Sequence, residues 1–385
     1  MPARIQLPGR DEALVIPSPR WAAGYPPPAR RKVFAAAHVA AVVGPDGAPV
    51  IDWESTLRFR EHLWAHGFGV AEAMDTAQRG MGLSWEQASE LIARTAARAA
   101  EAGRLDALAC GAGTDQLADG GEHALRAIID AYAEQVAFVQ STGAQVILMA
   151  SRALAASARG PRDYLEVYGE LLKQADRPVI LHWLGEAFDP ALRGYWGGGG
   201  FDAAAATVLE LIDRAGGQVD GVKLSVLDAG REVSLRRRLP AGVRLYTGDD
   251  FNYAALIRGD ADGSHSDALL GTLAAITAPA AAALAALDRG DVAGYDAAME
   301  PTVPLSRLIF EPPTYHYKAG VAFLAWLNGL QPHFVMLGGL ERQRTAGHLI
   351  RVFELAVTAR ALREPELAAM RMGEMLARSA NSGPV

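Results

Sequence analysis

Residues 145–150 (Gln-Val-Ile-Leu-Met-Ala) and 178–184 (Pro-Val-Ile-Leu-His-Trp-Leu) are two short apolar runs on either side of a helical pattern at 161–175. Neither run alternates apolar with polar residues. Uninterrupted runs of this kind are typical of strands in a parallel sheet that helices cover on both faces. The stretch therefore predicts a strand–helix–strand unit of an α/β protein.

The same alternation extends in both directions along the chain. Strands are predicted at 32–38, 68–74, 105–110, 145–150, 178–184, 219–226, 243–247 and, more weakly, 261–266. Helices are predicted at 53–66, 84–102, 121–142, 161–175, 201–215, after 226, from 251 and at 269–287. The helix at 84–102 opens with Ser84 and Gln87 in capping-box spacing. Eight such units in roughly 260 residues predict a (β/α)₈ TIM barrel.

The alternative fold is an open, doubly wound sheet, which would require a glycine-rich turn after its first strand. Residues 35–40 (Ala-Ala-Ala-His-Val-Ala) contain no glycine, which favours the barrel. We predict an N-terminal arm at 1–31, the barrel at 32–290 and a C-terminal helical region at 291–385 that packs on the barrel.

Composition excludes several classes of protein. The 385 residues are 50% hydrophobic, which excludes a disordered chain, and the net charge of −7 argues against a nucleic-acid binder. Cys110 is the single cysteine, so neither an internal disulfide nor a cysteine-based zinc cluster is expected. No apolar run is long enough to cross a membrane, and residues 1–31 do not resemble a signal peptide. We expect a cytoplasmic protein.

Lysine is rare, and one lysine occupies an unusual position. Only Lys32, Lys173, Lys223 and Lys318 occur among 37 basic residues. Lys223 lies within the predicted strand 219–226, where burying an ammonium group is costly unless it is paired or loses its proton. A deprotonated amine is a nucleophile for a carbonyl carbon. The position alone leaves two readings open, an imine-forming lysine or a lysine paired at the strand end.

Several short motifs occur in the order of a known superfamily. Residues 221–225 (Gly-Val-Lys-Leu-Ser), 245–250 (Leu-Tyr-Thr-Gly-Asp-Asp) and 178–182 (Pro-Val-Ile-Leu-His) resemble strand ends of the dihydrodipicolinate synthase/N-acetylneuraminate lyase superfamily. Residues 83–86, 262–266, 289–291 and 313–318 resemble its segments too, so the likeness covers roughly residues 32–335. The chain is similar to a divergent branch of this superfamily.

The resemblance implies a class I lyase or aldolase in which Lys223 forms an imine with a substrate ketone. The sequence differs from the superfamily pattern at two places that bear on the substrate and the mechanism. Residues 75–79 (Asp-Thr-Ala-Gln-Arg) replace the turn that holds a keto-acid carboxylate in the superfamily, and His182 replaces its catalytic tyrosine. Imidazole can still relay protons near neutral pH. A mouth rich in carboxylates and histidines suits hydroxyl groups, so we expect a keto-sugar or a polyhydroxy keto acid, with either C–C cleavage or loss of water.

Active sites of such barrels lie at the carboxyl ends of the strands. With Lys223 and His182 as catalytic residues, we expect substrate contacts from further side chains at these ends: Glu72, Asp75, Thr76, Ser225, Thr247, Asp249 and His265. Asp249 has a structural alternative as the cap of the following helix. No cofactor and no metal are expected, and the partner is a small carbonyl compound.

Two other functions remain open from the sequence. A metal-dependent sugar isomerase or epimerase would place Glu72, His182, Asp249 and His265 around one divalent ion. A non-catalytic, ligand-binding barrel would leave Lys223 unreactive. The resemblance implies a homodimer or homotetramer, with neither nucleic acid nor membrane as a partner. The glycines at 197–200 could wrap a phosphate or form a lid or linker.

Overall fold

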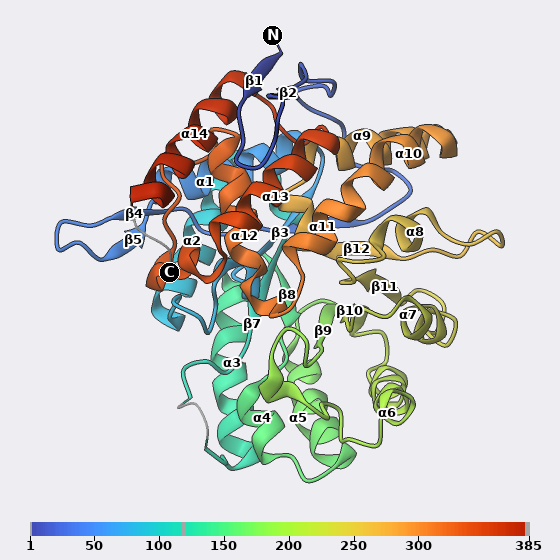
Figure 1. Ribbon diagram of the computed structural model, residues 1–385. Coiled ribbons are helices and arrows are strands. Elements are labelled where there is room, and N and C mark those ends of the chain that lie inside the picture. The colour runs from blue at the N-terminus through green and yellow to red at the C-terminus, as the bar shows by residue number, and fades with distance from the viewer. Residues whose placement is uncertain (1, 118–120, 382–385) are drawn as a thin grey trace. The chain divides into compact units, whose positions relative to one another are not determined.

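The computed structural model describes residues 2–117 and 121–381, and its central feature is a closed barrel of eight parallel strands. The strand order around the barrel is β10-β11-β12-β3-β6-β7-β8-β9, which joins sequence neighbours throughout (Figure 1). The predicted (β/α)₈ fold is confirmed. The barrel strands are β3 (Val33–Ala36), β6 (Gly69–Glu72), β7 (Leu108–Ala112), β8 (Gln145–Leu148), β9 (Val179–Leu184), β10 (Val219–Ser225), β11 (Arg244–Thr247) and β12 (Asp267–Leu270).

The barrel interior is a packed core. One buried cluster takes a side chain from every strand but β10, and these side chains are Phe34, Ala71, Ala109, Ile147, Ile180, Tyr246 and Leu269. Because side chains on a strand alternate between its two faces, these residues fix which positions point inward. The cluster therefore serves as the reference for locating the functional side chains.

Helices alternate with the strands along the chain. Ser84 and Gln87 form the predicted capping box at the start of the helix that follows β6. In the part of the chain that holds the barrel the helices are α2 (Trp85–Glu101), α3 (Leu125–Ser141), α4 (Arg152–Ser157), α5 (Pro161–Gln174), α6 (Phe201–Arg214), α7 (Ala229–Arg236) and α8 (Tyr253–Arg258). All but α4 were predicted, with shifts at their ends.

Contacts divide the chain into two compact units. One unit, residues 31–37 and 69–270, contains the whole barrel. The other comprises residues 1–30, 38–68 and 271–385. It holds β1 (Ala3–Ile5), β2 (Leu14–Ile16), β4 (Ala41–Val43), β5 (Pro49–Ile51), α1 (Trp53–Ala65), α9 (Thr277–Asp288), α10 (Val292–Met299), α11 (Val303–Ile309), α12 (Tyr317–Leu327), α13 (Ala346–Thr358) and α14 (Pro365–Asn381). The ends of the predicted arm and C-terminal region, residues 1 and 382–385, lie outside the described residues.

The eighth barrel strand was predicted in the wrong place. Residues 261–266 form a loop, and the strand is β12 at Asp267–Leu270. Within the loop the N–H of Asp260 donates to O of Ser264 at 2.8 Å, and the N–H of Ser264 donates to the Asp262 carboxylate at 2.9 Å. These local bonds satisfy the backbone without a neighbouring strand. The following alanine-rich helix correspondingly begins at Thr277 and not at 269.

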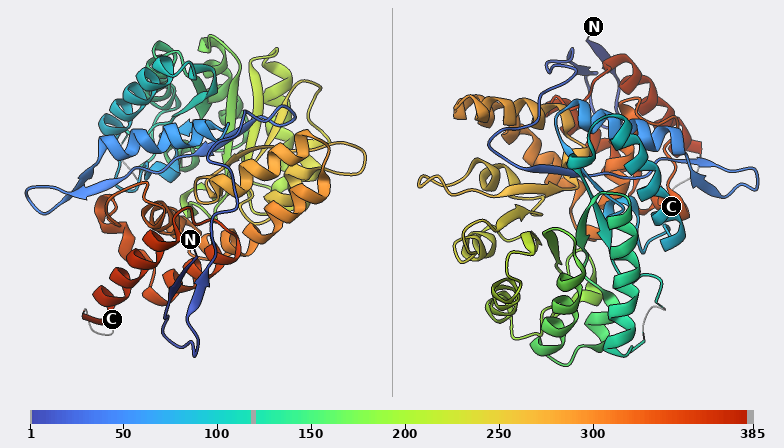
Figure 2. Two further views of the ribbon diagram at one scale, coloured as in Figure 1. Left: turned by 90° about the horizontal axis from the view of Figure 1, so that it is seen from above. Right: turned by 180° about the vertical axis from the view of Figure 1, so that it is seen from behind.

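Two antiparallel hairpins of the second unit were not predicted. Strands β1 and β2 pair within the N-terminal arm, and β1 contacts α14. Strands β4 and β5 pair in a second hairpin, which extends from the helices of its unit (Figure 2).

In the described part of the chain, no helix combines the length and the apolar character that a membrane span requires.

Candidate active site

Lys223 lies on β10 and its side chain faces the barrel interior. In the sheet register Lys223 is opposite Tyr246 of β11 and His182 of β9. Tyr246 belongs to the interior cluster, as does Ile180, two residues before His182 on the same strand. Side chains at paired positions of neighbouring strands lie on the same face. The register thus brings Lys223 and His182 side by side inside the barrel.

The environment of Lys223 lowers the pKa of its amine. The side chain is only 5% exposed. Burial lowers the pKa of the amine below its ordinary value, while the negative charges of Asp75 and Asp250 raise it and offset part of this effect. Among the described residues Lys223 forms no ion pair. The amine is therefore more nucleophilic near neutral pH than a lysine in solvent.

His182 is fully buried and lacks hydrogen-bond partners. Its exposed fraction is 0%, and in the described structure neither ring nitrogen has a partner. Burial holds the pKa of His182 well below its ordinary value, and the charge of Lys223 lowers that pKa further. Buried polar groups are normally paired. A neutral imidazole with two unused nitrogens beside a buried amine is the arrangement expected where a ligand completes the hydrogen bonds.

Asp75 and Thr76 lie in a tight turn after β6. The turn is the 3₁₀ segment Asp75–Ala77, and the flanking Ala73 and Gln78 both have positive φ, at 52° and 67°. Such backbone is uncommon for residues other than glycine and often marks functional sites. The charge of Asp75 acts on both Lys223 and His182. The turn therefore brings a carboxylate close enough to influence both the amine and the imidazole.

Arg79, which follows this turn, connects it to the end of β7 and to α3. Its guanidinium donates to O of Gly111 at 2.7 Å and forms an ion pair with Asp115 at 2.7 Å. It also donates to the side chain of Gln135. Asp115 accepts from Arg79 and Gln135, and these contacts hold the pKa of its carboxyl below the ordinary value despite burial. Asp115 is thus committed to a structural ion pair and does not add a free carboxylate to the mouth.

Ser225 completes the interior side of β10. It lies two residues beyond Lys223, so both side chains leave the strand on the same face. The neighbouring Gly248 leaves room for it: a Cβ at position 248 would collide with Oγ of Ser225 and lie 2.8 Å from O of Leu224.

Gly248→Ala should therefore displace the end of β10. We expect lower thermal stability and weaker imine formation at Lys223, measured by melting temperature and by reductive trapping.

Three predicted substrate contacts lie elsewhere. Glu72 accepts from the N–H of Ala73 and, at 2.8 Å, from the hydroxyl of Thr95 on α2, so its side chain points away from the interior. Thr247 donates to Glu232 of α7 at 2.9 Å, again outside the barrel. His265 lies in the loop before β12, with Nδ1 at 3.1 Å from O of Gly263. Strand register and charge connect Lys223 with His182, Asp75 and Asp250, and Ser225 leaves β10 on the same face. Thr76 is buried in the turn next to Asp75.

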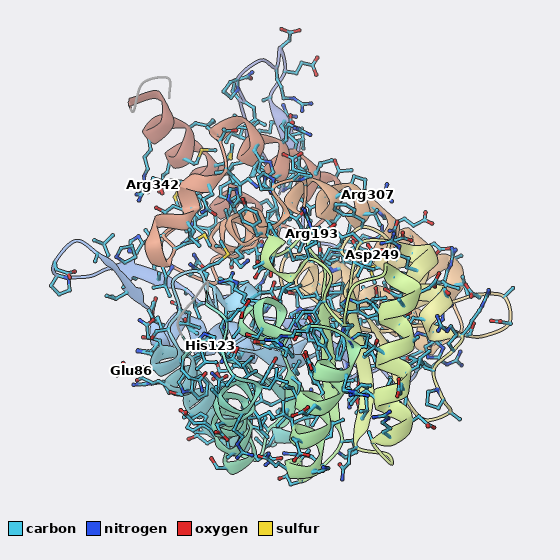
Figure 3. All side chains as sticks on the ribbon, turned by 90° about the horizontal axis from the view of Figure 1, so that it is seen from below. Glu86, His123, Arg193, Asp249, Arg307 and Arg342 are labelled. Atoms are coloured by element: carbon cyan, nitrogen blue, oxygen red, sulfur yellow. The ribbon has the colours of Figure 1, made fainter. Side chains whose placement is uncertain are left out.

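Asp249 forms its hydrogen bonds within the turn after β11. Its carboxylate accepts from the N–H groups of Phe251 at 2.9 Å and Asn252 at 3.0 Å, and from the Asn252 side chain at 2.7 Å. Asp249 is labelled in Figure 3. The next residue, Asp250, supplies the charge that acts on Lys223. Both aspartates were visible in the sequence at the end of the seventh barrel strand, and the contacts of Asp249 are those of the cap that the sequence left open as its alternative role.

The four residues of the metal-site alternative do not come together. The carboxylates of Glu72 and Asp249 accept hydrogen bonds from backbone N–H groups one or two residues further along the chain, and His265 lies in a loop. In residues 2–117 and 121–381, no three His, Cys, Asp or Glu side chains are arranged to hold a metal ion. The geometry gives this alternative no support.

Comparisons with known proteins place the chain. A family model described as "Protein of unknown function (DUF993)" matches residues 6–380. The chain belongs to the DUF993 family. No match was found among curated proteins.

The DUF993 chain shares its fold with solved dihydrodipicolinate synthases. The enzyme from Oceanobacillus iheyensis is 16% identical, with a TM-score of 0.63, and the match covers 85% of this chain and 95% of that chain. The enzyme from Bacteroides thetaiotaomicron is 17% identical, with a TM-score of 0.63 and coverages of 85% and 98%. A prophage protein of the same family from E. coli K12, solved in complex with pyruvate, is 14% identical, with a TM-score of 0.62 and coverages of 85% and 99%. The resemblance read from the sequence is confirmed as a likeness of fold.

The placement of Glu72 in this DUF993 chain gives a prediction about stability. Glu72→Ala removes the acceptor of two buried hydrogen bonds and should cost about 1–3 kcal/mol of unfolding free energy. Imine formation at Lys223 should persist in the folded protein. Chemical denaturation and reductive trapping measure the two effects. Glu86→Ala on the exposed face of α2 is the matched control, and loss of trapping in folded Glu72→Ala would place Glu72 in the site after all.

Proposed function

We propose that this protein is a Schiff-base-forming lyase that acts on a keto-sugar or a polyhydroxy keto acid through Lys223. The observation that carries the proposal is the buried, interior-facing Lys223 beside His182, whose two ring nitrogens have no partner in the described structure. The shared barrel with dihydrodipicolinate synthases supports it, since that fold accommodates such a site at the same strand ends.

In the proposed reaction, the amine lone pair of Lys223 attacks the ketone carbon and the carbonyl oxygen takes up a proton. Loss of this oxygen as water gives an iminium ion. In C–C cleavage His182 removes the proton from the β-hydroxyl, the adjacent C–C bond breaks, and its electron pair moves into the iminium to form an enamine and an aldehyde. The enamine then regains a proton from His182, and hydrolysis of the imine frees Lys223. In the alternative dehydration, the iminium instead supports removal of an α-proton and loss of the β-hydroxyl as water.

The side chains around Lys223 favour hydroxyl groups on the substrate. Carboxylates of Asp75 and Asp250 act on the amine, and Thr76 and Ser225 are buried hydroxyl residues of the same strand ends. Carboxylates accept hydrogen bonds from hydroxyls but repel another carboxylate. We infer that the polar part of the substrate near Asp75 is a hydroxylated chain. The proposal further places the enzyme in the cytoplasm, in carbohydrate metabolism, as a homodimer or homotetramer.

Reductive trapping tests this function. Borohydride converts an imine to a stable secondary amine, so the protein is treated with borohydride in the presence of 2-keto acids and keto-sugars, digested, and analysed by mass spectrometry. We expect the mass of a hydroxylated ketone, less one oxygen atom, to be added at Lys223, because the imine forms with loss of water and its reduction adds two hydrogen atoms. Lys173, exposed and paired with Glu170 at 2.6 Å, is the internal control and should stay unmodified. If no carbonyl compound gave an adduct at Lys223, the lyase proposal would be wrong, and the alternative of a non-catalytic, ligand-binding barrel would stand.

The acid residues around Lys223 predict the pH dependence of trapping. The amine reacts only when deprotonated, so the trapping rate should rise with pH through the pKa of Lys223 and level off at a lower pH than for a lysine in solvent. Because the charge of Asp75 raises that pKa, Asp75→Asn should move the rise to lower pH still. Asp213→Asn on the exposed face of α6 is the control. A profile that stays in place in Asp75→Asn would contradict the proximity of Asp75 to the amine.

A further inference from the structure

A cavity lies within the unit that holds the N-terminal arm, and Lys223 is not among its lining residues. It has a volume of about 190 Å³. Its walls come from the arm at Trp21, from His66 after α1, from Ala278 in α9 and from the segment 360–364 between α13 and α14. The proposed function makes no use of this cavity.

Two flat rings form part of the wall. The indole N–H of Trp21 donates to O of Arg360 at 2.9 Å, which fixes the ring against the segment 360–364. His66 is 4% exposed, and its Nδ1 lies 2.8 Å from O of His62, so this nitrogen carries the proton. Burial lowers the pKa of His66, which keeps the ring neutral. An indole and a neutral imidazole offer stacking surfaces to a planar ligand.

The cavity also carries an excess of positive charge. Arg360 and Arg363 line it, against one acidic residue, Glu364. Within the described residues neither arginine forms an ion pair, although the protein as a whole has a net charge of −7. The positive charge of Arg363 also lowers the pKa of His66. Arg360 holds a left-handed backbone, with φ of 55°, while its carbonyl accepts from Trp21. Guanidinium groups bind carboxylates through paired hydrogen bonds.

We propose that this cavity is a binding site for a small planar organic anion, a one-ring aromatic or heteroaromatic carboxylate. Its carboxylate binds Arg360 and Arg363, and its ring lies against Trp21 and His66. The size supports this class, because sites for drug-sized ligands measure about 300–1,000 Å³ and this cavity is smaller. Neither Lys223 nor His182 is among the residues that line the cavity.

Fluorine NMR on the full-length protein tests the site with 4-fluorobenzoate as the probe. Its neutral counterpart, 4-fluorobenzamide, has the same shape without the charge. We expect the fluorobenzoate signal to broaden and shift on addition of protein and unlabelled benzoate to reverse the effect, while fluorobenzamide binds at least about tenfold more weakly. Arg360→Gln and Arg363→Gln should each weaken fluorobenzoate at least about tenfold, since tenfold corresponds to about 1.4 kcal/mol, a typical value for a charged hydrogen bond.

Two control variants separate this site from other sources of binding. Arg58→Gln, on α1 and paired with Glu54 at 3.3 Å, removes an arginine outside the cavity and should bind the probe as the native protein does. Lys223→Ala should also bind it unchanged, so failure of the imine proposal leaves this test intact. Equal binding of the benzoate and the benzamide, binding that survives both arginine substitutions, or no binding at millimolar probe would each overturn the proposal.

Discussion

Lys223→Ala is expected to abolish the borohydride-trapped adduct and to lower lyase turnover on the order of 10⁴-fold or more, since loss of a covalent nucleophile ranks among the largest single-residue effects. The physical reason is that the remaining groups of the site are acids, a neutral imidazole and hydroxyls, and none of them can form an iminium. Mass spectrometry of the trapped protein and a turnover assay on the substrate found by trapping measure the two losses.

Lys173→Ala is the matched control for this substitution. Lys173 lies in α5 and its amine is exposed and paired with Glu170. Both the adduct at Lys223 and the turnover should therefore equal those of the native protein. A folded Lys223→Ala protein that retains turnover above a tenth of the native rate would show that the reaction does not pass through this amine.

His182→Leu is expected to separate turnover from stability. Proton transfer by a positioned side chain contributes about 10²–10⁴-fold, so turnover should fall by that amount while imine formation at Lys223 continues. The unfolding free energy should change little, because the buried imidazole has no hydrogen-bond partner to lose in the described structure and leucine is of similar size. Reductive trapping, turnover and chemical denaturation on one preparation distinguish these effects.

His38 is the control for His182, because it is a buried histidine whose ring does have a side-chain hydrogen bond. Its Nε2 lies 2.7 Å from Oε1 of Gln331, and burial lowers its pKa to about 4. His38→Leu leaves the Gln331 side chain without this partner and should cost about 1–3 kcal/mol. If His182→Leu proved as destabilising as His38→Leu and kept full turnover, the relay role of His182 would be wrong.

The fold and the central residue could be predicted because their signals are local. Uninterrupted apolar strands separated by helices indicated the barrel, and one lysine inside such a strand indicated Lys223. The eighth strand was misplaced at 261–266, a segment that contains the Asp-Gly-Ser turn at 262–264. That turn satisfies its backbone locally, whereas Ala268, Leu269 and Leu270 carry the buried strand pattern.

The wider site could not be predicted because it depends on strand parity and register. Glu72 lies among alanines, and nothing in the sequence shows that Ala71 faces inward and Glu72 outward. Thr247 faces outward because its neighbour Tyr246 is opposite Lys223 in the register, a long-range property. The choice between Asp249 and Asp250 depends on the turn after β11, where a carboxylate satisfies two N–H groups.

The central claim is that Lys223 is a buried amine with a depressed pKa, and the small number of lysines makes it directly measurable. Protein labelled with ¹³C at lysine Cε should give four signals, for Lys32, Lys173, Lys223 and Lys318, and Lys223→Arg assigns the relevant one. We predict that the Lys223 signal titrates at a clearly lower pH than that of the exposed Lys173, and that a carbonyl ligand shifts it selectively. A Lys223 signal that titrates together with Lys173 and ignores every carbonyl compound would contradict the account.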